Sequence, residues 1–342
     1  MYLVTGGAGF FGETLIKKLL SNGEHVKSLD LNTPKIFHKN LQVFTGDIRD
    51  ENLVNKALKG VNIVHHNVAQ VPLNKNKNTL WSVNYYGTKN ILKSSLKNKI
   101  NHFVYTSSSA VYGIPTNNPI DELSPKVPIE NYGITKLAAE ELCIDYMNKG
   151  LNCSIIRPRT ILGEGRLGIF QILFEWIHVN KNIPVIDGGK NIYQFVHAKD
   201  LADACISAGE KKKGKNFNIG TNKYSSITDA LQNLIINSNS KSKIKSVSSK
   251  LIKIPMNISS VLGLSPLSKY HAEMYGKSIY FNISLAQKDL DFKPIYSNDE
   301  MFIESYNWYS RNRDSILKGK LSGSKHQSAL RQKILSFVPY II

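Results

Sequence analysis

Tyr132 and Lys136 are the residues of this 342-residue chain whose types and spacing best fit acid–base chemistry. On a helix, residues four apart lie on one face, so the two side chains would be neighbours. A phenol with a pKa near 10 is a weak base at neutral pH, but a neighbouring ammonium group favours the phenolate and lowers that pKa. Such a tyrosine can exchange a hydroxyl proton while a hydride moves. The alternative interpretation is a buried tyrosine beside a lysine with no catalytic role.

Three consecutive serines, Ser107, Ser108 and Ser109, follow an apolar stretch at residues 103–105. If that stretch is a strand, the serines lie at its carboxyl end, where a hydroxyl group could donate a hydrogen bond to a substrate carbonyl. Serine clusters at strand ends also form caps and turns. The triplet therefore indicates either a substrate contact or a turn.

Glycines at Gly6, Gly9 and Gly12 follow a short apolar strand predicted at residues 2–5 and precede an amphipathic helix. This arrangement brings a pyrophosphate against backbone N–H groups at a helix N-terminus. The spacing is Gly-x-x-Gly-x-x-Gly rather than the Gly-x-Gly-x-x-Gly of the general dinucleotide fingerprint. A plain surface turn is the alternative, and the flanking strand and helix argue against it.

Strands and helices alternate through the first half of the chain, which favours βαβ units and a parallel sheet. The ligands of such a sheet gather at the carboxyl ends of its strands. Asp30, residues 46–49, residues 65–67 and the three serines lie at or near such ends. Strands are predicted at residues 26–29, 41–44, 61–64, 103–105 and 154–156, and helices at about 79–96 and 132–147.

After about residue 160 the alternation loosens, with a helix predicted near 169–179, a strand at 193–196 and a helix at 200–208. The fold class expected is α/β: a Rossmann-type doubly wound parallel sheet with a smaller C-terminal substrate-binding lobe. The Rossmann domain would span residues 1–160 and take in parts of 190–220. Residues 161–310 would form the mixed lobe, and 311–342 a basic C-terminal extension.

Taken together, these segments resemble the extended short-chain dehydrogenase/reductase family, which includes the NAD-dependent UDP-sugar 4-epimerases, sugar dehydratases and 3β-hydroxysteroid dehydrogenases. The resemblance is dense over the N-terminal half and looser to about residue 310. It rests on Thr5-Gly6-Gly7-Ala8-Gly9-Phe10-Phe11-Gly12, Asp30, Gly46-Asp47-Ile48-Arg49-Asp50, residues 66–70, Val83-Asn84-Tyr85-Tyr86-Gly87-Thr88, residues 107–113, Tyr132-Gly133-Ile134-Thr135-Lys136 and Arg157-Pro158.

The resemblance implies NAD as cofactor, with Tyr132 as acid/base and Ser108 as the catalytic serine, Ser107 and Ser109 being its neighbouring alternatives. Lys136 would contact the nicotinamide ribose. Asp30 would bind the adenosine ribose, and a carboxylate there repels the 2′-phosphate of NADP. The implied cofactor-binding residues are Gly6, Gly9, Phe10, Phe11, Gly12, Asp30, Asp47 and Ile48 (at the adenine), Val68, Ala69, Gln70, Asn84 (on a helix behind the site), Lys136 and Pro158.

Two departures from the family pattern narrow the chemistry. Sugar 4,6-dehydratases carry Asp-Glu after the catalytic Ser/Thr, whereas Ser109-Ala110 stands here, which argues against dehydration. Nucleotide-sugar enzymes often carry Arg-Asp before the Phe-Val-His strand, the arginine holding the substrate diphosphate. Tyr193-Gln194 stands here instead. The candidate substrate residues are Ser109, Tyr193, and Arg159 and Arg166 as substitutes for that arginine.

The sequence thus predicts an NAD-dependent epimerase of a sugar or nucleotide sugar. The first alternative is a net NAD-dependent dehydrogenase of the 3β-hydroxysteroid dehydrogenase type, acting on a larger apolar alcohol. The second is a non-catalytic NAD-binding protein, against which Ser108, Tyr132 and Lys136 argue. Adjacent strand residues point to opposite faces, so His65-His66 is not expected to bind a metal.

A formal net charge of +18 reflects lysines spread along the whole chain, which favours a solvated surface over a nucleic-acid partner. Cys143, Cys153 and Cys205 are scattered and suit a reducing compartment. The first strand leaves no room for a signal peptide, and no apolar run reaches the roughly 18–20 residues of a membrane span, so a cytoplasmic protein is expected. We also expect a homodimer.

The stretch 311–342 carries seven Lys/Arg against one Asp314 and ends in an apolar segment at 334–342. A basic, partly amphipathic tail of this kind can make peripheral contact with an anionic membrane surface. A frayed extension or a packing arm is the plainer interpretation and is favoured.

Overall fold

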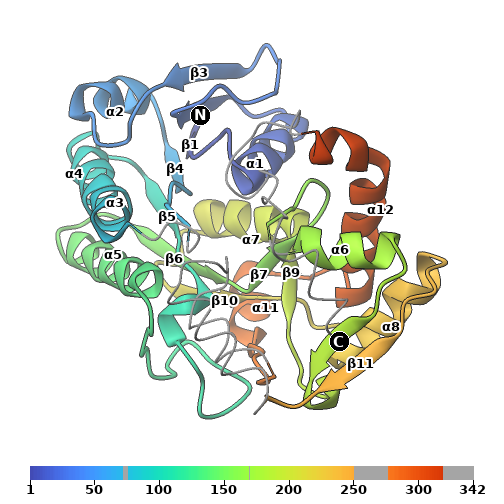
Figure 1. Cartoon of the computed structure of the whole chain (residues 1–342). Coiled ribbons are helices and arrows are strands. Elements are labelled where there is room, and N and C mark those ends of the chain that lie inside the picture. Colours follow the sequence, from blue (N-terminus) through green and yellow to red (C-terminus); the bar gives the residue numbers. More distant parts are fainter. Residues whose placement is uncertain (72–75, 169, 250–275, 319–342) are drawn as a thin grey trace.

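A parallel sheet forms the centre of the computed structural model, which describes residues 1–71, 76–168, 170–249 and 276–318. Within these residues the largest sheet has seven strands in the order β10-β6-β5-β4-β1-β2-β3 (Figure 1). The order reverses at β1, which is where a doubly wound sheet opens a crevice for ligands. This confirms the predicted Rossmann-type fold. The strands are β1 (Tyr2–Thr5), β2 (Val26–Asp30), β3 (Leu41–Thr45), β4 (Ile63–His66), β5 (His102–Thr106), β6 (Cys153–Pro158) and β10 (Asn216–Ile219).

Helices cover both faces of the sheet, and successive strand residues are apolar because alternate side chains point into two different cores. Tyr2 and Val4 belong to one core, which α1 (Phe10–Ser21), α7 (Ala198–Lys211) and α11 (Ser284–Leu290) cover. Leu3 belongs to the other core. The second core is covered by α2 (Glu51–Leu58), α4 (Thr88–Lys97) and α5 (Asn131–Asn148).

The helix predicted over residues 79–96 is divided into three parts. It begins as α3 (Lys77–Leu80), passes through a π-helical segment, η1 (Trp81–Gly87), and continues as α4. The side-chain amide of Asn84, in η1, forms hydrogen bonds with residues outside its own helix, as described below. Gly87, at the end of η1, packs closely against Ile48, because a Cβ at Gly87 would lie 2.7 Å from Ile48 Cγ2. Such π segments often occur near functional sites.

The second lobe has its own apolar core, built from elements of the C-terminal half (Figure 1). Two small parallel sheets frame it, one pairing β8 with β11 and the other β7 with β9. Residues 311–317, which we expected to begin the basic extension, instead form the end of α12. Ile169 and residues 319–342, which include the rest of that predicted extension, lie outside the described residues. The elements are β7 (Thr160–Leu162), α6 (Phe170–His178), β8 (Ile183–Ile186), β9 (Phe195–His197), α8 (Ile227–Asn237), β11 (Ile244–Val247) and α12 (Asn298–Leu317).

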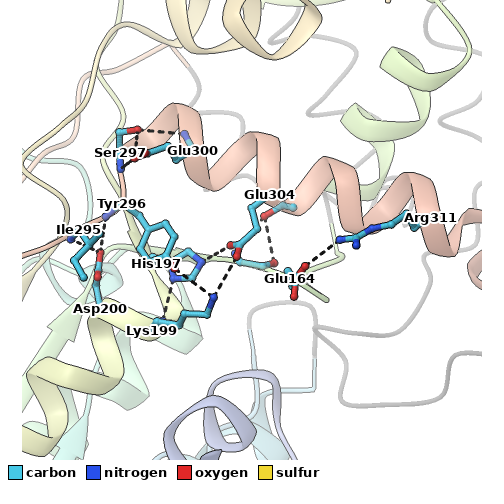
Figure 2. Close-up of polar contacts among 12 residues, drawn as sticks. Glu164, His197, Lys199, Asp200, Ile295, Tyr296, Ser297, Glu300, Glu304 and Arg311 are labelled. Atoms are coloured by element: carbon cyan, nitrogen blue, oxygen red, sulfur yellow. Dashed lines mark hydrogen bonds and ion pairs between the residues drawn. The ribbon is translucent and has the colours of Figure 1, made fainter. Parts of the chain in front are cut away.

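A set of polar contacts joins α12 to the β9–α7 junction (Figure 2). The buried His197 ring bonds to the Glu304 carboxylate and stacks on Tyr296 with ring centroids 3.7 Å apart. Farther along α12, Arg311 pairs with Glu164 at 3.0 Å, in the loop that follows β7. The Arg311–Glu164 pair ties the loop at residues 163–166 to α12. In the described part of the chain, no helix is both long and apolar enough to cross a membrane.

Candidate active site

A cavity of about 760 Å³ lies where the carboxyl ends of the central strands meet the second lobe. Its wall combines the segments in which the sequence predicts cofactor, catalytic and substrate residues. Of the predicted site residues, the cavity is lined by Gly6, Gly9, Phe10, Phe11, Gly12, Asp30, Asp47, Ile48, Val68, Ala69, Gln70, Ser108, Ser109, Tyr132, Lys136, Pro158, Arg159, Arg166 and Tyr193. Asn84 does not line it.

The glycine loop leaves the first turn of α1 open toward the cavity. Gly6 has a positive φ of 70°, and its carbonyl accepts a hydrogen bond of 3.0 Å from the Gly9 N–H. A Cβ at Gly12 would lie 2.0 Å from that same carbonyl oxygen, so only glycine lets the helix approach so closely. Gly9 is the N-cap and has no side chain to occupy the first-turn N–H groups. This cradle fits the pyrophosphate of NAD.

Two carboxylates lie on the same side of the cavity but are held differently. Asp30 ends β2, and its oxygens accept the backbone N–H groups of Ala8 at 3.2 Å and Asn32 at 3.0 Å. Asp47 is ion-paired with Arg49, whose hydrogen bonds lower the pKa of that carboxyl. Asp30 thus keeps acceptor capacity for ribose hydroxyls. Arg49 also lines the cavity, although its sequence context did not single it out as a site residue.

Ser108 and Tyr132 are brought together by the close approach of α5 to a short 3₁₀ helix, η2 (Ser109–Tyr112). Gly133 makes this approach possible, because a Cβ there would lie 2.6 Å from the carbonyl oxygen of Ala110. Ser108 is the N-cap of η2, where its hydroxyl oxygen accepts from the Ala110 N–H at 3.2 Å. Burial raises the pKa of the Tyr132 phenol, and the nearby Ser108 hydroxyl partly offsets that rise. The two groups can therefore address one substrate oxygen.

Lys136 does not act on Tyr132 as its sequence spacing predicts. Its ammonium group donates to the backbone oxygen of Thr106 at 2.6 Å and lies 4.5 Å from the centroid of the Tyr105 ring. These contacts direct it toward β5, and burial lowers its pKa to about 7. The cation that lowers the pKa of Tyr132 is instead Arg166, while burial keeps that pKa above its ordinary value. The expectation of a lowered pKa was wrong.

A buried ion pair joins α5 to β6 and was not predicted from the sequence. Glu140 accepts hydrogen bonds from Arg157 at 2.9 and 2.7 Å and from the Ser107 hydroxyl at 2.6 Å. Ser107 is thereby committed to Glu140, which leaves Ser108 as the serine beside Tyr132. The spacing of four residues between Lys136 and Glu140 does not reveal this pair, because Glu140 bonds to Arg157 on another element and Lys136 to Thr106.

Asn84 acts behind the cavity wall rather than on it. Its side chain accepts from the Gln70 N–H at 2.7 Å, and donates to the Gln70 oxygen and to Thr135 Oγ1, each at 3.1 Å. It thus ties the loop at residues 68–70 to α5.

His65 and His66 face opposite sides of the sheet, as predicted. His65 stacks on Tyr2, with ring centroids 5.9 Å apart. His66 bonds to Thr5 at 2.7 Å and to Thr88 at 3.0 Å. Burial lowers the pKa of each ring to about 3, so both are neutral at physiological pH.

The cavity wall also contains two cations and an apolar surface. Arg159 lies over the ring of Tyr193, 4.6 Å from its centroid, and Arg166 lies 5.8 Å from the centroid of Phe10. The apolar wall comes from separate segments and was not predicted. It includes Ile172, Leu173 and Trp176 of α6, Ile183 and Val185 of β8, Ile227 and Leu231 of α8, and Phe302 of α12.

Sequence comparisons agree with this geometry. The model of the NAD dependent epimerase/dehydratase family matches residues 2–220. "Uncharacterized protein y4nG" of Sinorhizobium fredii is 48% identical over 341 residues, 99% of this chain and 86% of that protein. A putative UDP-glucose 4-epimerase of Methanocaldococcus jannaschii is 34% identical over 67% of this chain and 79% of its own. The decarboxylating sterol-4-alpha-carboxylate 3-dehydrogenase of Bos taurus is 31% identical over 63% of this chain and 64% of its own.

Solved structures show the same fold. The UDP-glucuronic acid 4-epimerase from Bacillus cereus, determined in complex with NAD, matches with a TM-score of 0.75 and 24% identity. The match covers 91% of this chain and 98% of that one. It therefore takes in the second lobe as well as the sheet domain.

Proposed function

The chain belongs to the NAD dependent epimerase/dehydratase family, and we propose that within this family it epimerises a carbinol of a sugar or nucleotide sugar. Family membership identifies an NAD-dependent enzyme, so the non-catalytic interpretation is set aside. The observation that carries the proposal is the placement of Ser108 and Tyr132 together on the wall of the cavity that contains the glycine cradle. The relative from Methanocaldococcus jannaschii supports the sugar assignment.

In the proposed mechanism, Tyr132 removes the proton of the substrate hydroxyl. Ser108 donates a hydrogen bond to the same oxygen and holds the ketone that results. When bound, NAD supplies the acceptor that takes up the carbinol hydrogen as hydride and returns it. Epimerisation requires the ketone to turn over before the hydride returns to its opposite face. Lys136, held by Thr106, would contact the nicotinamide ribose.

The roles of the remaining residues follow from their positions. Gly6, Gly9 and Gly12 would hold the pyrophosphate, and Asp30 the adenosine ribose. The loop at residues 68–70, which Asn84 fixes, would lie along the cofactor. Arg159 and Arg166 would bind the substrate.

A net dehydrogenase of a larger apolar alcohol is the second candidate. It is favoured by the apolar wall contributed by α6, β8 and α8, and by Tyr193-Gln194 in place of an arginine that would hold a diphosphate. The bovine sterol dehydrogenase relative supports it. Dehydration is disfavoured, because Ser109-Ala110 offers no acid–base pair beside Ser108.

The cofactor balance separates the two candidates. An epimerase is expected to purify with tightly held NAD and to release no net NADH on turnover, whereas a dehydrogenase accumulates NADH when substrate and NAD are supplied. The Tyr132→Phe variant should lose about 10²–10⁴-fold in kcat in either case, with NAD affinity retained. Full activity of this variant would show that the acid/base assignment is wrong.

Several further properties belong to the same proposal. The three cysteines are free and buried, which supports a reducing, cytoplasmic location. The division at about residue 160 is supported by the separate apolar core of the second lobe. A homodimer is carried over from the family resemblance, and sedimentation analysis of the purified protein tests it.

A further inference from the structure

The loop that follows β7 is held by α12, a helix far away in the sequence. The Gly163 backbone N–H donates to the Ser305 hydroxyl oxygen at 3.2 Å, and the same hydroxyl donates to the Gly163 carbonyl oxygen at 3.2 Å. Ser305 is only 1% exposed, so water does not compete for these two hydrogen bonds. One side chain of α12 therefore binds both polar groups of the Gly163 backbone.

The Gly163 carbonyl also closes the turn at residues 163–166. The Arg166 backbone N–H donates to it at 3.1 Å, and Gly165, the third residue of the turn, has a positive φ of 86°. A hydrogen bond from the fourth residue to the first, with glycine in the third position, is typical of a type II turn. One carbonyl oxygen thus joins the Ser305 hydroxyl to the backbone from which the Arg166 side chain leaves.

Two further contacts come from the next turns of α12. Arg311 pairs with Glu164 at 3.0 Å (Figure 2), and an added Cβ at Gly165 would lie 3.9 Å from Trp308 Cζ2. The Arg311–Glu164 pair is exposed, and exposed pairs of this kind add little to stability. The buried contact at Ser305 should therefore hold the turn most firmly.

The side chain that the turn carries faces the active site. Arg166 lines the cavity, and its guanidinium carbon lies 5.8 Å from the centroid of the Phe10 ring. Tyr132 lines the same cavity; burial raises the pKa of its phenol, and the Arg166 charge partly offsets that rise. Burial lowers the pKa of Arg166 to about 10, so the guanidinium is still charged at neutral pH. The turn thus carries a cation that acts on the Tyr132 phenol.

The other polar and charged groups that the described structure places around this phenol belong to different elements. They are Ser108 at the start of η2, Glu130 directly before α5, Lys136 on α5 and Tyr105 on β5. These residues lie outside the turn that α12 holds. A change in α12 should therefore reach the phenol through Arg166.

We propose that Ser305 is a positioning residue, which acts through the turn at residues 163–166 to hold the Arg166 guanidinium on the cavity wall beside the acid/base phenol. The inference rests on the proposed function for the role of that phenol, Tyr132, as acid/base. Without the Ser305 hydroxyl, the turn keeps its internal hydrogen bond but loses its buried anchor on α12. Because α12 packs in the core of the second lobe, this lobe would contribute to the acid–base chemistry as well as to substrate binding.

The titration of Tyr132 in the NAD-loaded protein tests this role without requiring a substrate. Labelling with ¹³C at the tyrosine Cζ gives an NMR signal for each phenol, and the signal missing from Tyr132→Phe identifies Tyr132. We expect Arg166→Gln to raise the midpoint of this titration by about one pH unit, because an opposite charge is removed. Ser305→Ala should raise the midpoint by a smaller amount. In an Arg166→Gln background, Ser305→Ala should add nothing, because the group through which it acts is absent.

The matched control is Ser154→Ala. Ser154 is also buried, and its hydroxyl forms a hydrogen bond of 2.8 Å with the His102 ring; like Ser305, it does not line the cavity. Its loss should lower stability and leave the Tyr132 midpoint unchanged. If Ser305→Ala also leaves that midpoint unchanged, or moves it equally with and without Arg166, the role of Ser305 is purely structural and the proposal is wrong.

A second variant and a second measurement complete the test. If Ser305→Ala does not fold, Ser305→Cys keeps a side chain of similar size but replaces the hydroxyl with a weak hydrogen-bond donor, and it should still raise the midpoint. During turnover, the alkaline-rising limb of kcat should move to higher pH in Ser305→Ala, with KM little changed. A midpoint that depends on Ser305 through Arg166, in an enzyme that epimerises no sugar, would count against the proposed function alone.

Discussion

The Glu140 carboxylate holds the guanidinium group of Arg157 through two hydrogen bonds of 2.9 and 2.7 Å, with both side chains about 1% exposed. Glu140 lies one helical turn after Lys136. Its carboxylate also accepts a hydrogen bond from the hydroxyl group of Ser107, the residue before Ser108. The pair therefore couples α5, β6 and the loop at residues 107–109 in a single buried network.

Breaking this pair should be strongly destabilising. Glu140→Gln leaves the Arg157 cation buried without its counter-charge, and we expect a loss of about 3–5 kcal/mol in the free energy of unfolding. Chemical denaturation monitored by circular dichroism measures it. The double variant Glu140→Gln/Arg157→Met removes both charges, so its loss should be smaller than the sum of the two single losses. Strict additivity would contradict the coupling.

The depressed pKa of Lys136 should make stability depend on pH. In the folded protein this pKa is about 7, against an ordinary value of 10.5, so between these values the unfolded chain binds more protons. Stability contributed by this residue therefore rises with pH from about 7 to about 10, by up to roughly 5 kcal/mol. Lys136→Met removes the titrating group and should flatten this rise. Parallel curves for the two proteins would refute the prediction.

Arg166 and Glu130 should shift the pH dependence of activity in opposite directions. Arg166 lowers the pKa of Tyr132 and Glu130 raises it. Arg166→Gln should therefore move the alkaline-rising limb of kcat to higher pH, and Glu130→Gln should move it to lower pH. At a fixed pH below that pKa, the phenolate fraction changes about tenfold when the pKa moves by about one. The pH profiles of kcat, measured for both variants at saturating substrate, test this prediction. If the rising limbs of both variants shift in the same direction, the opposite electrostatic effects assigned to Arg166 and Glu130 are wrong.

The glycine cradle should not tolerate a side chain at Gly12. Gly12→Ala places a Cβ 2.0 Å from the Gly6 carbonyl oxygen, which forces α1 away from β1 and distorts the phosphate-binding loop. We expect NAD affinity to fall by at least about tenfold, or about 1.4 kcal/mol. Gly150→Ala is the control for a general loss of stability, because Gly150 has a positive φ that strains any side chain, yet it does not line the cavity and has no atom within 4 Å of the added Cβ. Unchanged NAD binding in Gly12→Ala would contradict the fit.

The sequence alone was sufficient to predict the part of the protein that holds the cofactor. Apolar segments of strand length alternate with helical ones, and the glycines at Gly6, Gly9 and Gly12 follow the first strand directly. These patterns are local, because strand alternation, turn glycines and helix faces depend on neighbours only a few residues away. The parallel sheet and the place of Tyr132 could therefore be predicted from the sequence alone.

Tertiary structure decided which charges lie around the Tyr132 phenol. Lys136 shares a helix face with Tyr132, yet its ammonium group turns to Thr106, and Arg166 from a loop of the second lobe acts on the phenol instead. The apolar wall likewise joins α6, β8 and α8, which come together only in the folded lobe. Electrostatic effects depend on distance and burial in space, and neither can be read from spacing along the chain. The sequence motifs thus determined which cofactor the protein binds. Packing between distant segments determined the charges and the apolar surface around the cavity.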